Sequence, residues 1–427
     1  MNQLNLEKGW QMLRLLMWGI PVAVLMGTLG AFFLWALDFV AALRHAHVKF
    51  IYCLPLAGIA IYALYARYGA SLAAGNQRLL EAVEDPQVKV PLRLAPLILL
   101  TTLMTHLFGG SAGREGTALQ MGGSLAAAWG DSMRLNATER KGLLLAGMAA
   151  GFAAVFGTPA TGAFFAFEIL RTRQFRCDFL LLCLALAFLA DWVCHLFPIQ
   201  HVSYHIEALA QPLFALSVFN ALFWVKLLLV ALAFGLVARS FIWSGQQIKV
   251  TATKWIRPPW LIPVMGGLGV LLICYCLGRL DYLGLGVQSP DPEAVTICSA
   301  FQAGGADPFS WFCKALLTIV TLSLGFKGGE VTPLFFIGAT LGNSLAVVLG
   351  LPIDLLAGLG MVAVFAAATH APLACCIMSV ELFGWESLGY FVAVIYLANY
   401  CSGPVNIYQK QRLLTWLDVK LKQWLFR

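Results

Sequence analysis

Charged side chains are scarce in this chain. Only 11% of its 427 residues are Asp, Glu, Lys or Arg, whereas 60% are hydrophobic and the mean hydropathy is +0.80. A soluble domain usually contains about a quarter charged residues, so this composition excludes a soluble protein and predicts an integral membrane protein. The net charge of +7 is scattered over loops beside apolar runs. It is typical of membrane-flanking residues, and we expect no nucleic-acid partner.

Motifs for metal binding and catalysis are also missing. The seven histidines form no HExxH motif, and His201 and His205 lie in a polar segment between apolar runs. The eleven cysteines lack the spacing of metal ligands, which favours their interpretation as small hydrophobic residues. No serine occupies a nucleophile-like turn with a plausible histidine. We therefore expect no metal, no cofactor and no enzyme activity, such as that of an intramembrane protease.

The two ends of the chain are basic. Lys8 and Arg14 precede the first long apolar run, and no clean cleavage site for a signal peptide follows them. This charge favours a cytoplasmic N-terminus. Residues 409–427 form a basic tail with apolar residues near helical spacing, which predicts a helix along the membrane surface. No appended soluble domain is expected.

Long apolar runs fill most of the remaining sequence. Several are shorter than the ~20 residues that a straight spanning helix needs, and glycines, 40 in all, interrupt others. Irregular backbone at membrane depth is tolerated only where it is buried or lines a wet cavity. The pattern predicts an all-α membrane protein of tilted and broken helices.

Two parts of the sequence repeat each other. Gly147–Glu168 and Gly360–Glu381 agree at eight of twenty-two aligned positions, including a proline and the closing glutamate. Upstream, Gly113–Leu119 and Gly328–Leu334 share Gly, Glu, Thr and Leu at the same offsets. Duplicated, Gly/Pro-interrupted apolar segments are typical of transporters whose repeats meet at a substrate site near mid-membrane. We expect one repeat in residues 1–210 and a second in 211–408.

Glu115 is an ionisable residue within this membrane segment, and such residues are functional candidates by default. It stands in Gly110-Ser-Ala-Gly-Arg-Glu-Gly-Thr117, where a helix start would direct unpaired amides toward one point and so create an anion site. When ionised, the carboxylate would occupy that site, and when protonated it would leave and admit a free anion. The alternative is that Glu115 only forms a salt bridge with Arg114 or packs in a loop.

These motifs resemble the CLC anion channels and anion/proton antiporters. The resemblance rests on the GREGT segment at 113–117, the GGEVTP segment at 328–333 and the two Pro-to-Glu helices, and it covers roughly residues 15–410. It implies two inverted-topology halves, a homodimer and a gating, proton-coupling role for Glu115. It also implies that the backbone amides of Glu330 and Val331 and the side chain of Tyr408 face the anion. The anion-binding set expected from the resemblance is Asn76, Arg114, Gly116, Glu330, Val331, Thr332 and Tyr408.

The sequence departs from chloride-handling relatives at informative positions. Asn76 stands where they have a Ser in a GSGIP-like segment, and Glu330 and Thr332 replace bulky apolar residues, a combination that resembles the fluoride-exporting branch. Ile169 occupies the position of the second glutamate of many chloride/proton antiporters, and the adjacent Glu168 is interpreted as structural. Fluoride holds water more tightly than chloride, so its site needs stronger donors. An amide NH₂ offers two donors, and a hydroxyl offers one.

The function expected from these residues is proton-coupled fluoride export across the bacterial inner membrane, with a chloride channel or chloride/proton antiporter as the alternative. Glu330 is expected either to stay neutral or to carry protons near the ion path. Three simpler interpretations stay open. Asn76 could be a helix N-cap, Thr332 could bond its own backbone, and Lys327 could neutralise Glu330.

Overall fold

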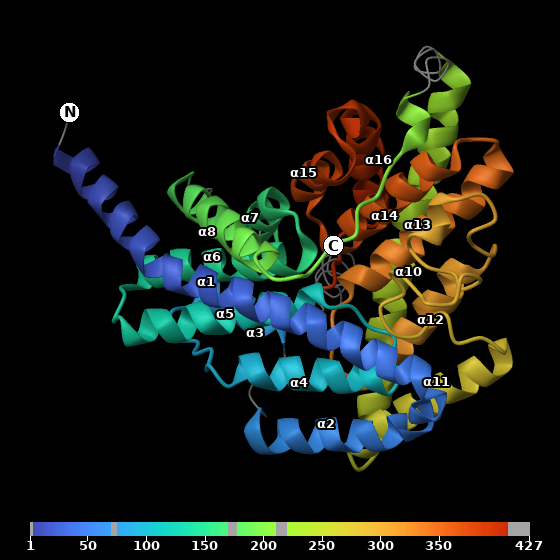
Figure 1. Ribbon diagram of the computed structural model, residues 1–427, viewed down its shortest axis with the longest axis horizontal. Helices are drawn as coiled ribbons and strands as arrows, with labels where there is room; N and C mark the ends of the chain where they lie inside the picture. Colours follow the sequence, from blue (N-terminus) through green and yellow to red (C-terminus); the bar gives the residue numbers. More distant parts are fainter. Residues whose placement is uncertain (1–2, 70–74, 170–176, 211–219, 409–427) are drawn as a thin grey trace, which may run out of the picture.

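Helices form nearly all the regular structure in the computed structural model (Figure 1), which describes residues 3–69, 75–169, 177–210 and 220–408. The predicted tail helix in 409–427 lies outside these residues. The helices of the first half are α1 (Gln3–Ala46), α2 (Leu54–Tyr68), α3 (Asn76–Glu84), α4 (Leu94–Leu107), α5 (Glu115–Ser132), α6 (Ala137–Phe156), α7 (Pro159–Glu168) and α8 (Cys177–His195). Those of the second half are α10 (Ala221–Trp255), α11 (Leu261–Leu277), α12 (Ser310–Ser323), α13 (Val331–Leu349), α14 (Ile353–Thr369), α15 (Pro372–Phe383) and α16 (Leu388–Cys401).

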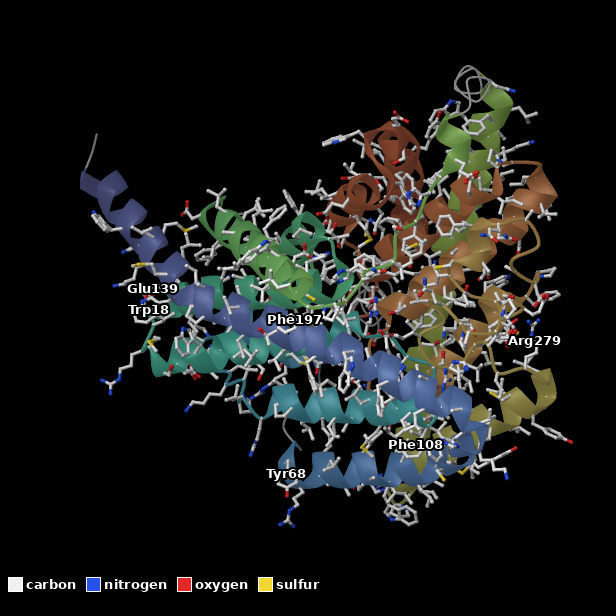
Figure 2. The ribbon with its side chains drawn as sticks, in the orientation of Figure 1. Trp18, Tyr68, Phe108, Glu139, Phe197 and Arg279 are labelled. Atoms are coloured by element: carbon white, nitrogen blue, oxygen red, sulfur yellow. The ribbon has the colours of Figure 1, made fainter. Side chains whose placement is uncertain are left out.

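Five helices in the described part of the chain are long and apolar enough to cross a membrane: Trp10–Ala46, Val48–Tyr68, Asp178–His195, Ala221–Trp255 and Val331–Leu349. Five further apolar helices are only 10–17 residues long. This mixture confirms the expected bundle of full and incomplete spans. In Figure 2, Glu139 is labelled near the N-terminal part of α1, and its carboxylate pairs with Arg14 of that helix. Arg279 is labelled on the opposite side of the view.

Glycines let matching helices of the two repeats approach closely. A Cβ atom added to Gly122 of α5 would lie 2.0 Å from the carbonyl oxygen of Gly147 in α6. At the matching place in the second repeat, a Cβ on Gly338 of α13 would lie 2.0 Å from the carbonyl oxygen of Gly360 in α14. Only glycine fits such backbone contacts. Gly147 and Gly360 are the first residues of the duplicated sequence, so close helix packing explains why both repeats have glycine at this position.

Reciprocal hydrogen bonds join the two repeats at the centre. Gly113 and Gly329 form an isolated antiparallel bridge, with N···O distances of 2.6 and 2.8 Å. Beside it, the amide of Ser111 donates to the Thr321 hydroxyl at 3.1 Å. The amide of Lys327 donates to the Thr105 hydroxyl at 3.3 Å. In the first of these bonds the amide belongs to the first repeat and the hydroxyl to the second, and in the other bond this arrangement is reversed. Such reciprocal bonds are expected of two repeats related by a pseudo-twofold axis.

The closing glutamates of the duplicated segments also act reciprocally. The Glu168 carboxylate accepts from the amides of Leu373 (2.9 Å) and Ala374 (2.7 Å), at the start of α15. The Glu381 carboxylate accepts from the amides of Ala160 and Thr161, both at 2.8 Å, at the start of α7. Each carboxylate satisfies amides that have no partner within their own helix and faces the positive end of its dipole. This geometry supports a structural role for Glu168.

Candidate functional site

Helix N-termini meet where the repeats touch. Helix α5 begins at Glu115, α13 begins at Val331 and α3 begins at Asn76. A Cβ atom added to Gly116 would lie 3.1 Å from the Gly329 Cα and 3.3 Å from the Asn76 Nδ2, so the three segments are in contact. The first amides of a helix have no acceptor within it and carry its positive dipole end. Their convergence, with Gly116 and Val331 in the first turns, favours an anion.

The Glu115 carboxylate occupies this junction. Its side chain is 1% exposed, and it accepts hydrogen bonds from the Thr332 hydroxyl at 2.7 and 2.9 Å and from the Thr332 amide at 3.2 Å. The amide of Arg114 donates to it at 3.3 Å, whereas the Arg114 guanidinium Nε lies 3.7 Å away. Glu115 is therefore held chiefly by the opposite repeat, and Thr332 donates to Glu115 rather than bonding its own backbone. The salt bridge with Arg114 is present but is not the only contact of Glu115, and the interpretation that Thr332 bonds its own backbone was wrong.

Two cavities are lined by residues near the buried carboxylate, although Glu115 itself lines neither. The larger, which we name the Asn76 cavity, has a volume of about 670 Å³. Its lining includes Tyr65, Gly75, Asn76, Gln120, Lys249, Glu330 and Tyr408. The smaller, the Arg114 cavity, has a volume of about 310 Å³. Its lining includes Asp38, Arg44, His106, Arg114, Gln200 and Asp281. Helix α4 connects them, because Ile98 lines the first and His106 the second.

Asn76 is the first residue of α3 and not its N-cap. The N-cap of α3 is Gly75, whose φ of 56° suits glycine, and Asn76 is the first helical residue. The Asn76 Oδ1 atom is buried without a hydrogen-bond partner among the described residues. This oxygen is an acceptor, and the donors that an anion would need are on the Asn76 Nδ2 group, which lies 3.3 Å from the position of a Cβ atom added to Gly116. The structure thus rejects the N-cap interpretation.

Gln120 belongs to the same lining, although the sequence analysis did not select it. Its Nε2 donates to the Gly116 carbonyl at 3.3 Å, and its Oε1 is buried with no partner in the described part of the chain. The signal available in the sequence was a lone amide side chain five residues after Glu115 on a helix of mostly small and apolar residues. An amide at membrane depth is costly unless it has a partner.

Glu330 faces the Asn76 cavity and is partly buried there. Lys327, three residues earlier, does not neutralise it, because the Lys327 ammonium stands 4.3 Å from the centroid of the Tyr65 ring and forms no ion pair within the described residues. Tyr408 lines the same cavity with a buried hydroxyl that has no partner in that part of the structure. Asn76, Glu330 and Tyr408 are therefore brought together in one cavity lining, whereas Arg114 lines the other cavity.

Comparisons with known proteins identify the family. The family described as "Voltage gated chloride channel" matches residues 57–403. The chain belongs to the CLC family. A "Chloride/fluoride channel protein" of Pseudomonas syringae pv. tomato is 40% identical over 401 residues, which cover 92% of this chain and 85% of the relative. An "H(+)/Cl(-) exchange transporter ClcA" of Vibrio parahaemolyticus is 26% identical over 419 residues, covering 91% of this chain and 85% of the relative.

Solved CLC structures share the fold. A CLC-type fluoride/proton antiporter superposes with a TM-score of 0.85 at 34% identity, covering 96% of this chain and 98% of the other. A slow cyanobacterial Cl⁻/H⁺ antiporter has a TM-score of 0.75 at 19% identity, with the same coverage of both chains, which is a likeness of fold alone. The two-repeat, all-helical membrane architecture and the family's role in ion transport are thereby confirmed for this chain.

Proposed function

We propose that this CLC protein exports fluoride in exchange for protons, with Glu115 as the gate. The observation that carries the proposal is the buried Glu115 carboxylate, which accepts hydrogen bonds from the amide and hydroxyl of Thr332 and whose neighbours Arg114 and Gln120 line two different cavities. The printed descriptions of the Pseudomonas relative and of the fluoride/proton antiporter structure support the choice of substrate. A chloride channel or chloride/proton antiporter is the alternative.

The gate acts through one proton. An ionised Glu115 takes the place of an anion, because its oxygens accept from Thr332 and face the starts of α5 and α13. Protonation removes the charge that those dipoles stabilise and occupies one acceptor oxygen, so the side chain is released. A free anion then enters the vacated position. The side chain that returns carries its proton to one cavity or the other, which couples the two fluxes.

Selectivity for fluoride follows from the number of hydrogen-bond donors that line the Asn76 cavity. The Asn76 amide offers two N–H donors, and Tyr408 offers a hydroxyl that has no other partner in the described structure. A small, strongly hydrated anion loses the most on desolvation, so close donors favour it over chloride. Ile169, buried at the end of α7, supplies no second glutamate. Glu330 is then the remaining carboxylate of the proposed anion site and the proposed carrier of protons to this cavity.

The proposed orientation follows from the basic N-terminus. With Arg14 at the cytoplasmic end of α1, this helix crosses the membrane and its Arg44 lines the Arg114 cavity. The Arg114 cavity therefore faces outward and the Asn76 cavity faces the cytoplasm. We assign the protein to the bacterial inner membrane as a homodimer in contact with lipid, with repeats in residues 1–210 and 211–408. It is proposed to act as a transporter and not as an enzyme.

Ion efflux from liposomes tests the function. Purified protein in liposomes loaded with fluoride or chloride should release fluoride much faster than chloride. Protons should enter as fluoride leaves, because export below equilibrium needs a coupled driving ion. Ion-selective electrodes and an external pH electrode record the three fluxes, and protein-free liposomes give the background. Equal fluoride and chloride efflux would instead support the chloride alternative.

Glu330→Gln is expected to change the pH dependence of transport. A glutamine keeps the shape of the side chain but cannot exchange a proton, so the fluoride efflux rate should respond less to pH than in the parent. Initial rates across acidic to alkaline buffers measure this response. Glu386→Gln, an exposed position outside the cavity, is the matched control and should keep the parental profile. Identical pH profiles and rates in Glu330→Gln would make Glu330 a structural residue.

A further inference from the structure

Three potential metal ligands meet at the end of α8. Asp191 and His195 lie one turn apart on this helix, and His201 follows in the next segment. One ligand atom from each residue lies within 4.8 Å of the other two. The Asp191 Oδ1 is 3.6 Å from the His195 Nδ1, and the His195 and His201 ring centroids are 4.9 Å apart. The sequence analysis expected no metal site, because it did not bring His201 back to the helix.

Two atoms of this cluster are buried and unsatisfied. The Asp191 Oδ1 and the His201 Nδ1 have no hydrogen-bond partner among the described residues. The other ring nitrogen of His201, Nε2, lies 3.3 Å from the Ala154 carbonyl. A histidine that donates one N–H to a backbone carbonyl leaves its second nitrogen as a lone-pair ligand, the usual arrangement at metal sites. The His201 Nδ1 therefore faces the cluster as an acceptor.

The position of His201 is fixed by backbone contact. Gly157, which ends α6 at φ 78°, faces the ring so closely that an added Cβ would lie 2.8 Å from the His201 Cγ. The unpaired nitrogen is thus held in place before any ion arrives.

We propose that Asp191, His195 and His201 bind a divalent transition-metal ion of the zinc class. Two imidazoles and one carboxylate suit Zn²⁺, with water in the fourth position, whereas Ca²⁺ and Mg²⁺ prefer oxygen ligands throughout. The exposed His195 side chain can adjust to close the ligand distances. Ile199, Gln200 and Val202, which flank His201, line the Arg114 cavity. The bound ion would fasten this segment to α8 at the mouth of that cavity.

Direct metal binding tests the site without reference to transport. The full-length protein, purified in detergent without a polyhistidine tag and stripped of metal, is titrated with Zn²⁺ by calorimetry and with Co²⁺ by visible absorption. One ion per chain is expected, with Co²⁺ bands of a nitrogen- and oxygen-ligated site. His195→Gln should weaken binding at least about tenfold and remove these bands, as loss of one of three ligands implies.

His205→Gln is the matched control, because His205 is an exposed histidine of the same segment outside the cluster. It should bind Zn²⁺ as the parent does. Asp191→Asn is a second variant that removes a ligand charge and should also weaken binding. The proposal is overturned if the parent binds no Zn²⁺, or if His195→Gln and Asp191→Asn bind it with parental affinity.

Discussion

Liposomes that contain Glu115→Gln protein will show no proton uptake above the protein-free background when fluoride flows outward. The glutamine keeps one oxygen to accept from the Thr332 hydroxyl and amide, so the side chain still fits the junction of α5 and α13. It cannot bind or release a proton, because an amide does not titrate in this range. Fluoride flux should be blocked or should continue without protons, according to whether the neutral side chain stays in place.

The measurement pairs a fluoride electrode with a pH electrode in weakly buffered solution. Glu84→Gln, at the exposed end of α3, makes the same chemical change outside the site and should leave proton uptake at the parental level. A gel-filtration profile that matches the parent establishes that Glu115→Gln protein is folded. Proton uptake that persists undiminished in that folded variant would remove Glu115 from the gating role.

The sequence predicted the outline of this site because its local signals agree. The glycine-rich segment around Glu115 predicted a helix start, and α5 begins at Glu115. The duplicated Gly-x-Glu-x-Thr pattern aligns Glu115 with Glu330, whereas the structure pairs Gly113 with Gly329 and begins α13 at Val331, so the repeats correspond one residue later than the pattern indicates. Gly147 and Gly360 open the duplicated segments, and the structure places them against Gly122 and Gly338 at matching positions. Such features depend on neighbours along the chain, or on a repeat visible in it, so a single sequence is enough to find them.

The sequence did not predict the contacts between the two repeats. Thr332 bonds to Glu115 across 217 residues, and nothing in either local pattern specifies this partner. The reciprocal capping by Glu168 and Glu381 was equally hidden, although both residues close a duplicated segment. His201 joins α8 only because the chain turns back after the helix. Pairings of this kind follow from tertiary packing, which propensity and periodicity do not determine.

Asn76→Ser is expected to narrow the preference for fluoride over chloride by roughly ten- to hundredfold. The substitution replaces two amide donors by one hydroxyl on a shorter side chain, and so makes this position like that of the chloride-handling relatives. A hydrogen bond to a charged group contributes about 1.5–3 kcal/mol, and the smaller, more strongly hydrated anion loses more when a donor is withdrawn. Fluoride efflux should slow relative to chloride, and chloride efflux should change less.

The ratio of initial fluoride and chloride efflux rates from matched liposomes measures this effect. Asn220→Ser is the control, since Asn220 caps α10 by accepting from the Leu222 amide at 2.9 Å, and serine serves equally well at an N-cap. That variant should keep the parental ratio. The buried Asn76 Oδ1 has no partner among the described residues, so the substitution breaks no hydrogen bond made by that atom. A change in the efflux ratio would then report the loss of the amide donors. An unchanged ratio in Asn76→Ser protein of normal yield would show that selectivity is set elsewhere, with the Thr332 hydroxyl and Gln120 the next residues to change.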